Sequence, residues 1–260
     1  TRHEKIEALG RVIDTLDILR VECPWDRKQT NESLRANTIE EVYELADALI
    51  KSDDMAIRKE LGDVLLHVLF YAKIGEESGS FDIADVADAL NEKLIFRHPH
   101  VFGDTEADTA QKVKENWEDL KLKEKGGNKT VLAGVPDALP AMIKAARIQE
   151  KAANVGFDWE ERRQVWDKVR EEAGELGREI DRMDSDRMEE EMGDLLFSLI
   201  NASRLYDINP ENALEKTNRK FIRRFNYVER RAAESGRNIR SLTLAEMDEL
   251  WNEAKQSEQK

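Results

Sequence analysis

The sequence predicts an all-α protein made of two tandem helical-bundle domains that are related by internal duplication. Apolar residues recur at helical spacing, and no stretch combines β-branched alternation with hairpin turns. One acidic motif also occurs twice at a constant separation. Of the 260 residues, 40% are hydrophobic and 37% are charged, which is typical of a soluble, helix-rich protein.

Five helical segments are expected in each half of the chain. Leu61 and Leu65 belong to the apolar stripe of one segment. Pro210 predicts a helix that begins with proline at its first position, and Thr243, three residues before Glu246, predicts a capping box. The expected helices are 5–20, 34–51, 55–78, 82–97 and 108–124 in the first half, and 139–153, 160–182, 185–206, 210–234 and 243–258 in the second.

The duplication sets the expected domain boundaries. The first copy covers 1–125 and the second covers 130–260, and the Gly-Gly-Asn-Lys segment at 126–129 has the composition of a linker. Outside the acidic motif, Trp25 matches Phe157 at a separation of 132 positions, within Pro-Trp-Asp and Gly-Phe-Asp. We expect these two aromatic residues to anchor the core of their domains.

The acidic motif consists of an ExxE pair followed by an ExxD pair. Residues three apart lie on one face of a helix, so two neighbouring helices would bring four carboxylates together. Their mutual repulsion calls for a cation. Carboxylate oxygens suit Mg²⁺, and Mn²⁺ fits the same ligands. The candidate metal ligands, each pair of counterparts 131 positions apart, are Glu41, Glu44, Glu60 and Asp63 in the first half and Glu172, Glu175, Glu191 and Asp194 in the second.

Other classes of metal site and partner fit less well. Zinc is disfavoured because the chain has four histidines and the single Cys23, and a di-iron bundle would need Glu-x-x-His pairs, which the sequence lacks. His67, one turn after Asp63, is expected in the core or behind the ligands. The net charge of −14 argues against a general nucleic-acid binder. The longest apolar run is too short to span a membrane, and the polar start of the chain does not resemble a signal peptide, so the cytoplasm is the expected location.

The combination of these motifs resembles the MazG family of all-α nucleoside triphosphate pyrophosphohydrolases. The resemblance covers the whole chain and includes the tandem arrangement, the segment Cys-Pro-Trp-Asp at 23–26 and the string Glu-Glu-Glu-Met-Gly-Asp-Leu-Leu-Phe at 189–197. It implies Mg²⁺-dependent cleavage between the α and β phosphates, which yields a nucleoside monophosphate and pyrophosphate. It also implies a homodimer.

Basic and aromatic residues of the second half complete the expected nucleotide site. Lys220, Arg223 and Arg224 supply three cations within five residues and match the phosphate-binding segment of the family. Lys168 is expected to bind the triphosphate as well. Trp251 either stacks on a nucleobase or packs the last helix onto the bundle.

The two halves differ around the acidic motif, and the differences favour catalysis by the second half. Lys168 corresponds to Asn37, Glu190 to Lys59, and Arg223 to Phe96. The second half therefore has more phosphate donors, and its Glu171 or Glu190 would orient or deprotonate the attacking water. The first half is then structural, regulatory or weakly active. Two alternatives stay open, namely a narrow hydrolase for one modified nucleotide and a non-catalytic helical scaffold or regulator.

Overall fold

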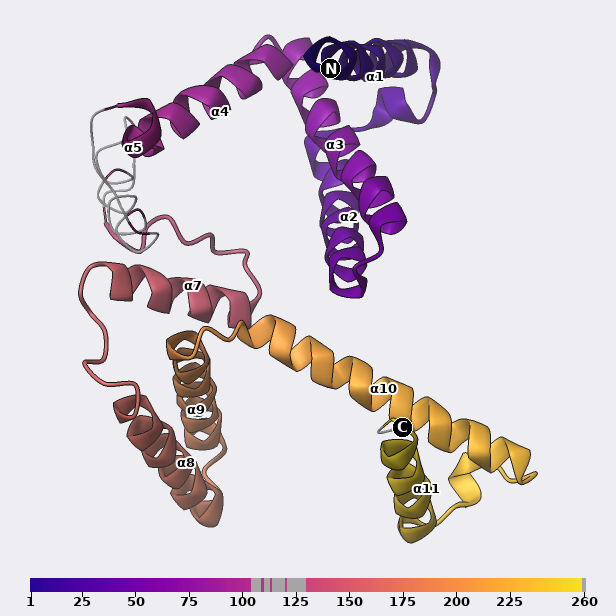
Figure 1. The fold of residues 1–260 in the computed structure, drawn as a ribbon, viewed down its shortest axis with the longest axis vertical. Helices are drawn as coiled ribbons and strands as arrows, with labels where there is room; N and C mark the ends of the chain where they lie inside the picture. Colours follow the sequence, from indigo (N-terminus) through magenta and orange to yellow (C-terminus); the bar gives the residue numbers. More distant parts are fainter. Residues whose placement is uncertain (104–108, 110–112, 114–119, 121–129, 259–260) are drawn as a thin grey trace. The chain divides into compact units, whose positions relative to one another are not determined.

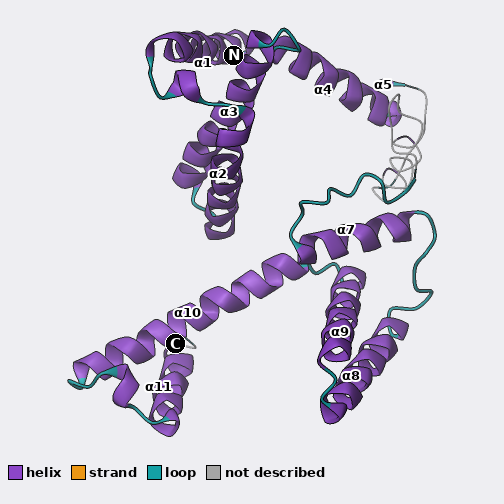
Figure 2. Ribbon diagram, turned by 180° about the vertical axis from the view of Figure 1, so that it is seen from behind, coloured by secondary structure: helices purple, strands orange, loops and turns teal. Residues whose placement is uncertain are grey.

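The computed structural model describes residues 1–103, 109, 113, 120 and 130–258 (Figure 1). Over these residues the chain forms helices and loops without a strand, as Figure 2 shows, so the all-α prediction is confirmed. The chain divides into two compact units, Thr1–Glu106 and Ala107–Lys260. The predicted linker at 126–129 and most of the predicted helix at 108–124 lie outside the described residues, so the predicted boundary stays a prediction.

The first unit is built around a pair of antiparallel helices, α2 and α3, which lie side by side (Figure 1). Helix α1 packs on α3, and the core between them contains Leu16, Leu34, Leu69 and Phe70, each no more than 5% exposed. The elements are α1 (Arg2–Glu22), the short 3₁₀ helix η1 (Asp26–Lys28), α2 (Asn31–Lys51), α3 (Asp54–Glu77), α4 (Ile83–Arg97) and α5 (Pro99–Phe102).

The second unit contains an equivalent pair, α8 and α9, and α7 packs on α9. Val165, Val169 and Ala202 form its core. Helix α10 pairs with α11 at the end of the chain. The elements are α7 (Ala141–Asn154), α8 (Gln164–Arg182), α9 (Ser185–Leu205), α10 (Pro210–Glu234), the 3₁₀ helix η2 (Ile239–Ser241) and α11 (Leu244–Ser257).

The two helix pairs share one turn geometry. Ser52 and Met183 end the first helix of each pair in the left-handed region, with φ of 55° and 58°. The next residue caps the second helix, since the side chains of Asp53 and Asp184 accept bonds from backbone N–H groups of α3 and α9. These turn residues keep the separation of 131 positions that relates the acidic motifs, so the repeat is also a structural one.

Nine of the predicted helices match observed ones, and the capping box at Thr243 and the first-turn Pro210 are confirmed. The largest difference is at the start of α8, which begins at Gln164 rather than at 160. The side-chain oxygen of Gln164 accepts a hydrogen bond from the Glu161 N–H, so residues 161–164 form a turn ahead of the helix. The predicted core role of Trp25 and Phe157 was wrong. They are 59% and 83% exposed, and both lie in segments that connect helices.

Among the described residues, no helix has both the length and the apolar composition that a membrane span requires.

A buried arginine, Arg20, joins three segments of the first unit. The guanidinium of Arg20 lies 5.4 Å from the ring centroid of Phe70, and its Nε and Nη2 donate to the Glu77 carboxylate at 2.8 and 2.5 Å. It also donates to the carbonyl oxygens of Asp26 and Gln29. Helix α1, the η1 segment and the end of α3 are therefore joined by one side chain.

Replacement of Arg20 by methionine should destabilise the first unit by about 2 kcal/mol, because charge-assisted hydrogen bonds are lost from a buried position. The hydrogen bond from Arg20 lowers the pKa of Glu77 in the folded protein. The stabilisation that the Arg20–Glu77 pair provides is therefore complete above the ordinary glutamate pKa of about 4.3. It is lost as the pH falls through the lowered pKa of Glu77. Urea unfolding at pH 7 and at pH 3 measures both effects. Arg35→Met, at an exposed position of α2, is the control, and an equal loss in both variants would contradict the role of Arg20.

Candidate metal and nucleotide site

The first acidic group lies between α2 and α3. Carboxylate oxygens of Glu41, Glu60 and Asp63 all approach within 4.8 Å of one another. Glu60 is buried, whereas Glu41 and Asp63 are half-buried. The fourth predicted ligand, Glu44, lies beside this group rather than within it. Three of the four carboxylates that the repeat singled out are thus brought together.

The second acidic group lies between α8 and α9. It comprises Glu172, Glu175 and Glu191, again with carboxylate oxygens within 4.8 Å of one another. Glu172 is 6% exposed, and the other two are half-buried. Asp194, the fourth predicted ligand, is exposed one turn along α9 from Glu191. The two groups therefore share two pairs of counterparts, Glu41 with Glu172 and Glu60 with Glu191. Their third member differs, since it is Asp63 in the first unit and Glu175 in the second.

Carboxylates held this close perturb one another. Desolvation, followed by the charges of Asp63 and Glu44, raises the pKa of Glu41. Desolvation also raises the pKa of Glu191, with further contributions from Glu175 and other acids around it. Both shifts mean that the ionised form is disfavoured at these positions. A divalent cation would relieve the repulsion, and an all-carboxylate donor set fits Mg²⁺ or Mn²⁺.

A lysine ammonium lies against each acidic group. Lys59 Nζ is 3.0 and 3.1 Å from the two Glu60 carboxylate oxygens, 3.3 Å from Asp63 and 4.0 Å from Glu44. Lys168 Nζ is 2.7 Å from Glu172 and 3.1 Å from Glu171. These bonds raise the pKa of both lysines. Both lysines therefore act here as counter-ions of the acids. Sequence reasoning noted Lys59 only as a charge reversal, although its position four residues before Asp63 is the signal of a helical ion pair.

His67 belongs to the core of the first unit and is not a member of the acidic group. It is 8% exposed, and its Nδ1 lies 2.9 Å from Thr38 Oγ1, which is also 2.6 Å from the Tyr71 hydroxyl. This placement confirms the expected core role.

The basic residues predicted to bind phosphate lie on α10. Arg223 Nε donates to the Glu258 carboxylate at 2.7 Å, and Arg224 does so at 2.7 and 2.9 Å. Lys220, one turn earlier, is exposed. Trp251 on α11 lies under the Arg224 guanidinium at 5.8 Å and contacts Phe221 with ring centroids 5.0 Å apart. Trp251 therefore packs α11 onto α10.

Within one chain, the basic residues of α10 and the second acidic group do not form a joint site. Helix α8, which carries Glu172 and Glu175, makes no contact with α10 or α11 in the described part of the chain. Lys168 alone among the predicted nucleotide ligands lies beside the acids. A site that combines the acids of α8 and α9 with the basic residues of α10 would therefore need an arrangement that one chain does not provide.

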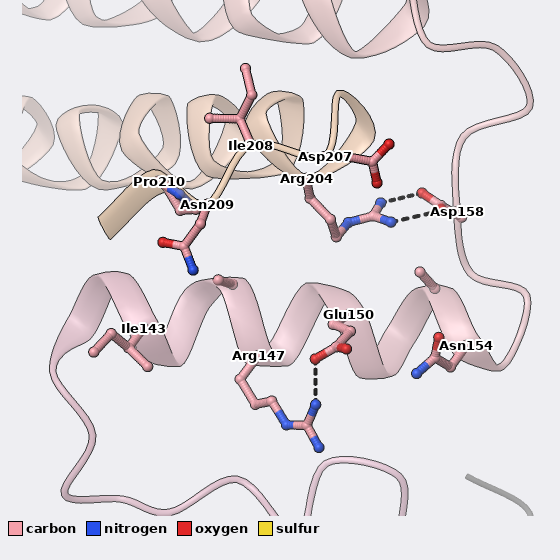
Figure 3. Close-up of a pocket in the computed structure, with 12 residues that line it drawn as sticks. Ile143, Arg147, Glu150, Asn154, Asp158, Arg204, Asp207, Ile208, Asn209 and Pro210 are labelled. Atoms are coloured by element: carbon pink, nitrogen blue, oxygen red, sulfur yellow. Dashed lines mark hydrogen bonds and ion pairs between the residues drawn. The ribbon is translucent and has the colours of Figure 1, made fainter. Parts of the chain in front are cut away.

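A separate cleft of about 630 Å³ lies between α7 and the connection from α9 to α10 (Figure 3). Four of its charged side chains form two ion pairs. Arg204 Nη1 donates to Asp158 at 2.9 Å, and Arg147 pairs with Glu150. The cleft contains none of the residues that the sequence predicted for catalysis or binding, so the acidic groups remain the candidate sites.

Each unit has a pair of helices, of which the first carries ExxE and the second carries ExxD. These features are typical of all-α proteins with a site made of carboxylates. The family model described as the MazG nucleotide pyrophosphohydrolase domain matches this chain twice, over 29–102 and 161–229. The chain belongs to this family. Both matches include the helix pair that carries an acidic group, whereas Trp251 and the rest of α11 lie beyond the second match.

Several curated proteins are similar over most of the chain. A Thermotoga maritima protein named nucleoside triphosphate pyrophosphohydrolase/pyrophosphatase MazG is 46% identical over 90% of this chain and 89% of its own length. The Escherichia coli K12 nucleoside triphosphate pyrophosphohydrolase is 42% identical over 91% of both chains. Bacillus subtilis YabN is 48% identical over 92% of this chain and 49% of its own length.

The raised pKa of Glu191 has a measurable consequence. In chelator, ionised Glu191 destabilises the fold, and this cost is complete above the raised pKa of the folded state. The cost declines as the pH falls through that raised pKa toward the lower pKa of the unfolded chain. Glu191→Gln should therefore melt at a higher temperature than the wild type in chelator at pH 7. With Mg²⁺ the order should reverse, because the variant loses a ligand. Glu189→Gln, at an exposed position of the same helix, is the control. A variant that melts lower than the wild type in chelator would contradict the repulsion.

Proposed function

We propose that this chain is a Mg²⁺-dependent nucleoside triphosphate pyrophosphohydrolase. The reaction converts a nucleoside triphosphate and water into a nucleoside monophosphate and pyrophosphate. The observation that carries the proposal is the convergence of Glu172, Glu175 and Glu191 within 4.8 Å, in a chain of the MazG family. The names of the Thermotoga and Escherichia coli relatives support the same reaction.

In the proposed mechanism, Glu172, Glu175, Glu191 and Asp194 hold the metal. Bound magnesium supplies positive charge for the phosphate oxygens as negative charge grows on them. The chain's own groups do the rest. Glu171 or Glu190, both exposed beside these ligands, orients the water or accepts its proton. The cations that would bind the phosphates are Lys168, Lys220, Arg223 and Arg224.

The proposal includes a homodimer. The α10 cations of one chain do not reach its own second acidic group, and a second chain would supply the missing side of the site. Large apolar side chains support this, because they are exposed both on α9, which carries acids of the second group, and on α10, which carries the basic residues. Examples are Leu196 and Phe197 on α9, which are 49% and 42% exposed, and Ile222 on α10, which is 57% exposed.

The proposed physiological role is broad-specificity clearing of the nucleotide pool in the cytoplasm, with no nucleic-acid partner. A narrow hydrolase for one modified nucleotide is the alternative enzyme. A non-catalytic helical scaffold or regulator would leave the three-carboxylate convergence without a purpose in either unit.

Metal dependence and products can be measured together. The purified chain should release monophosphate and pyrophosphate from several canonical triphosphates with Mg²⁺ or Mn²⁺, and turnover should vanish in chelator and return with added metal. Chromatography of the products over a panel of canonical and modified triphosphates is the assay. Turnover of a single modified nucleotide would favour the narrow hydrolase. Full activity after metal removal would refute the mechanism.

The two units can be tested separately. Glu172→Gln should lower turnover at least about 100-fold, because a carboxylate ligand is lost without a change in shape. Glu41→Gln, at the equivalent position of the first unit, should change turnover little. Steady-state assays with circular dichroism as a check of folding decide this. Loss of turnover in the Glu41 variant alone would move the proposed catalytic site to the first unit.

A further inference from the structure

Each acidic group holds a cation that the chain itself provides. Lys59 contacts the first group, and Lys168 contacts the second, at 2.7 to 3.3 Å from the nearest oxygens of Glu60, Asp63 and Glu172. In both units the lysine pairs with the most buried carboxylate, since the Glu60 and Glu172 side chains are only 9% and 7% exposed. The ammonium therefore neutralises the charge that water reaches least.

The two lysines occupy similar positions beside the acids but come from different helices of their pairs. Lys59 lies on α3, the second helix of its pair, whereas Lys168 lies on α8, the first helix of its pair. Their counterparts in the repeat are Glu190 and Asn37, so neither lysine is a copy of the other. A surface ion pair at helical spacing explains one such contact. Two non-equivalent lysines seated on equivalent carboxylate groups indicate a shared need for a positive charge there.

Both lysines are able to leave. The Lys59 side chain is 64% exposed and that of Lys168 is 39% exposed, and a lysine head on a flexible four-carbon stem can swing into water at little cost. A divalent ion needs the same oxygens at 2.0–2.1 Å for Mg²⁺. An ammonium at about 3 Å from these oxygens would repel the ion and occupy part of its coordination shell.

We propose that Lys59 and Lys168 are built-in placeholder cations, which stabilise the acidic groups when metal is absent and withdraw as a divalent ion binds. This inference rests on the metal site of the proposed function. It also separates the two units. Lys59 contacts Glu44, Glu60 and Asp63, whereas Lys168 contacts Glu172 alone among the predicted ligands. The first site therefore binds metal more weakly, because its placeholder must be released from more ligands.

The experiment measures Mn²⁺ binding to the full chain through the EPR signal of the free ion, without substrate. A Glu172→Gln/Glu191→Gln background disables the second site and isolates the first. In that background, Lys59→Gln should bind Mn²⁺ about tenfold more tightly, equivalent to about 1.4 kcal/mol. Lys51→Gln is the matched control, because it removes the same charge from the same unit. Lys51 pairs at 2.5 Å with Asp47, which is not one of the predicted metal ligands.

The reciprocal background, Glu60→Gln/Asp63→Asn, isolates the second site. There, Lys168→Gln should also bind Mn²⁺ more tightly, and Arg170→Gln, which removes a charge paired with Asp167 on the same helix, should not. In chelator, both lysine variants should melt at lower temperature than the wild type, and Mg²⁺ should raise their melting temperature by more.

The outcomes separate the inference from the function on which it rests. Tighter Mn²⁺ binding in the lysine variants alone supports the placeholders. Unchanged or weaker binding in Lys59→Gln and Lys168→Gln, with normal binding in the wild type, overturns the placeholder inference and leaves the metal site intact. No binding of Mn²⁺ by the wild type at all would overturn the metal site, and the placeholders with it.

Discussion

Repulsion between carboxylates on neighbouring helices is the constraint around which each unit is built. Three acidic side chains within 4.8 Å of one another oppose the packing of the helix pair that carries them. The opposing force is apolar contact elsewhere along the same helices, such as Leu34 with Leu69 in the first unit and Val165 with Ala202 in the second. The turn at Ser52 or Met183 fixes the register, so the acids meet whenever the core forms.

In each acidic group, a lysine lowers the repulsion mainly for the acids of one of the two helices. The carboxylate that pairs with lysine is the buried one, and the acid whose pKa is raised lies on the opposite helix. Glu41 faces Glu60 in this way, and Glu191 faces Glu172. Charge is therefore partly balanced but not cancelled. The remaining repulsion is what the proposed metal ion would relieve.

The cations that we propose for phosphate binding on α10 lie away from the acids of the same chain. Arg223 and Arg224 share the Glu258 carboxylate, and Trp251 is used to hold α11 on α10. These contacts satisfy the guanidinium groups within one chain. Apolar side chains stay exposed on α9 and α10, and the proposed homodimer would cover them and bring the α10 cations to the acids of the second chain.

The sequence by itself determined the helical fold, the repeat and most of the carboxylates that come together, because helical periodicity and a constant separation of 131 positions can be read directly along the chain. It did not reveal that Lys59 and Lys168 lie on the acids, that Glu44 and Asp194 stand at the margin, or that Trp25 and Phe157 are exposed. Those outcomes depend on side-chain rotamers and on which helix covers which surface. Only the tertiary structure decides them, since contacts between distant segments leave no periodic trace in the chain.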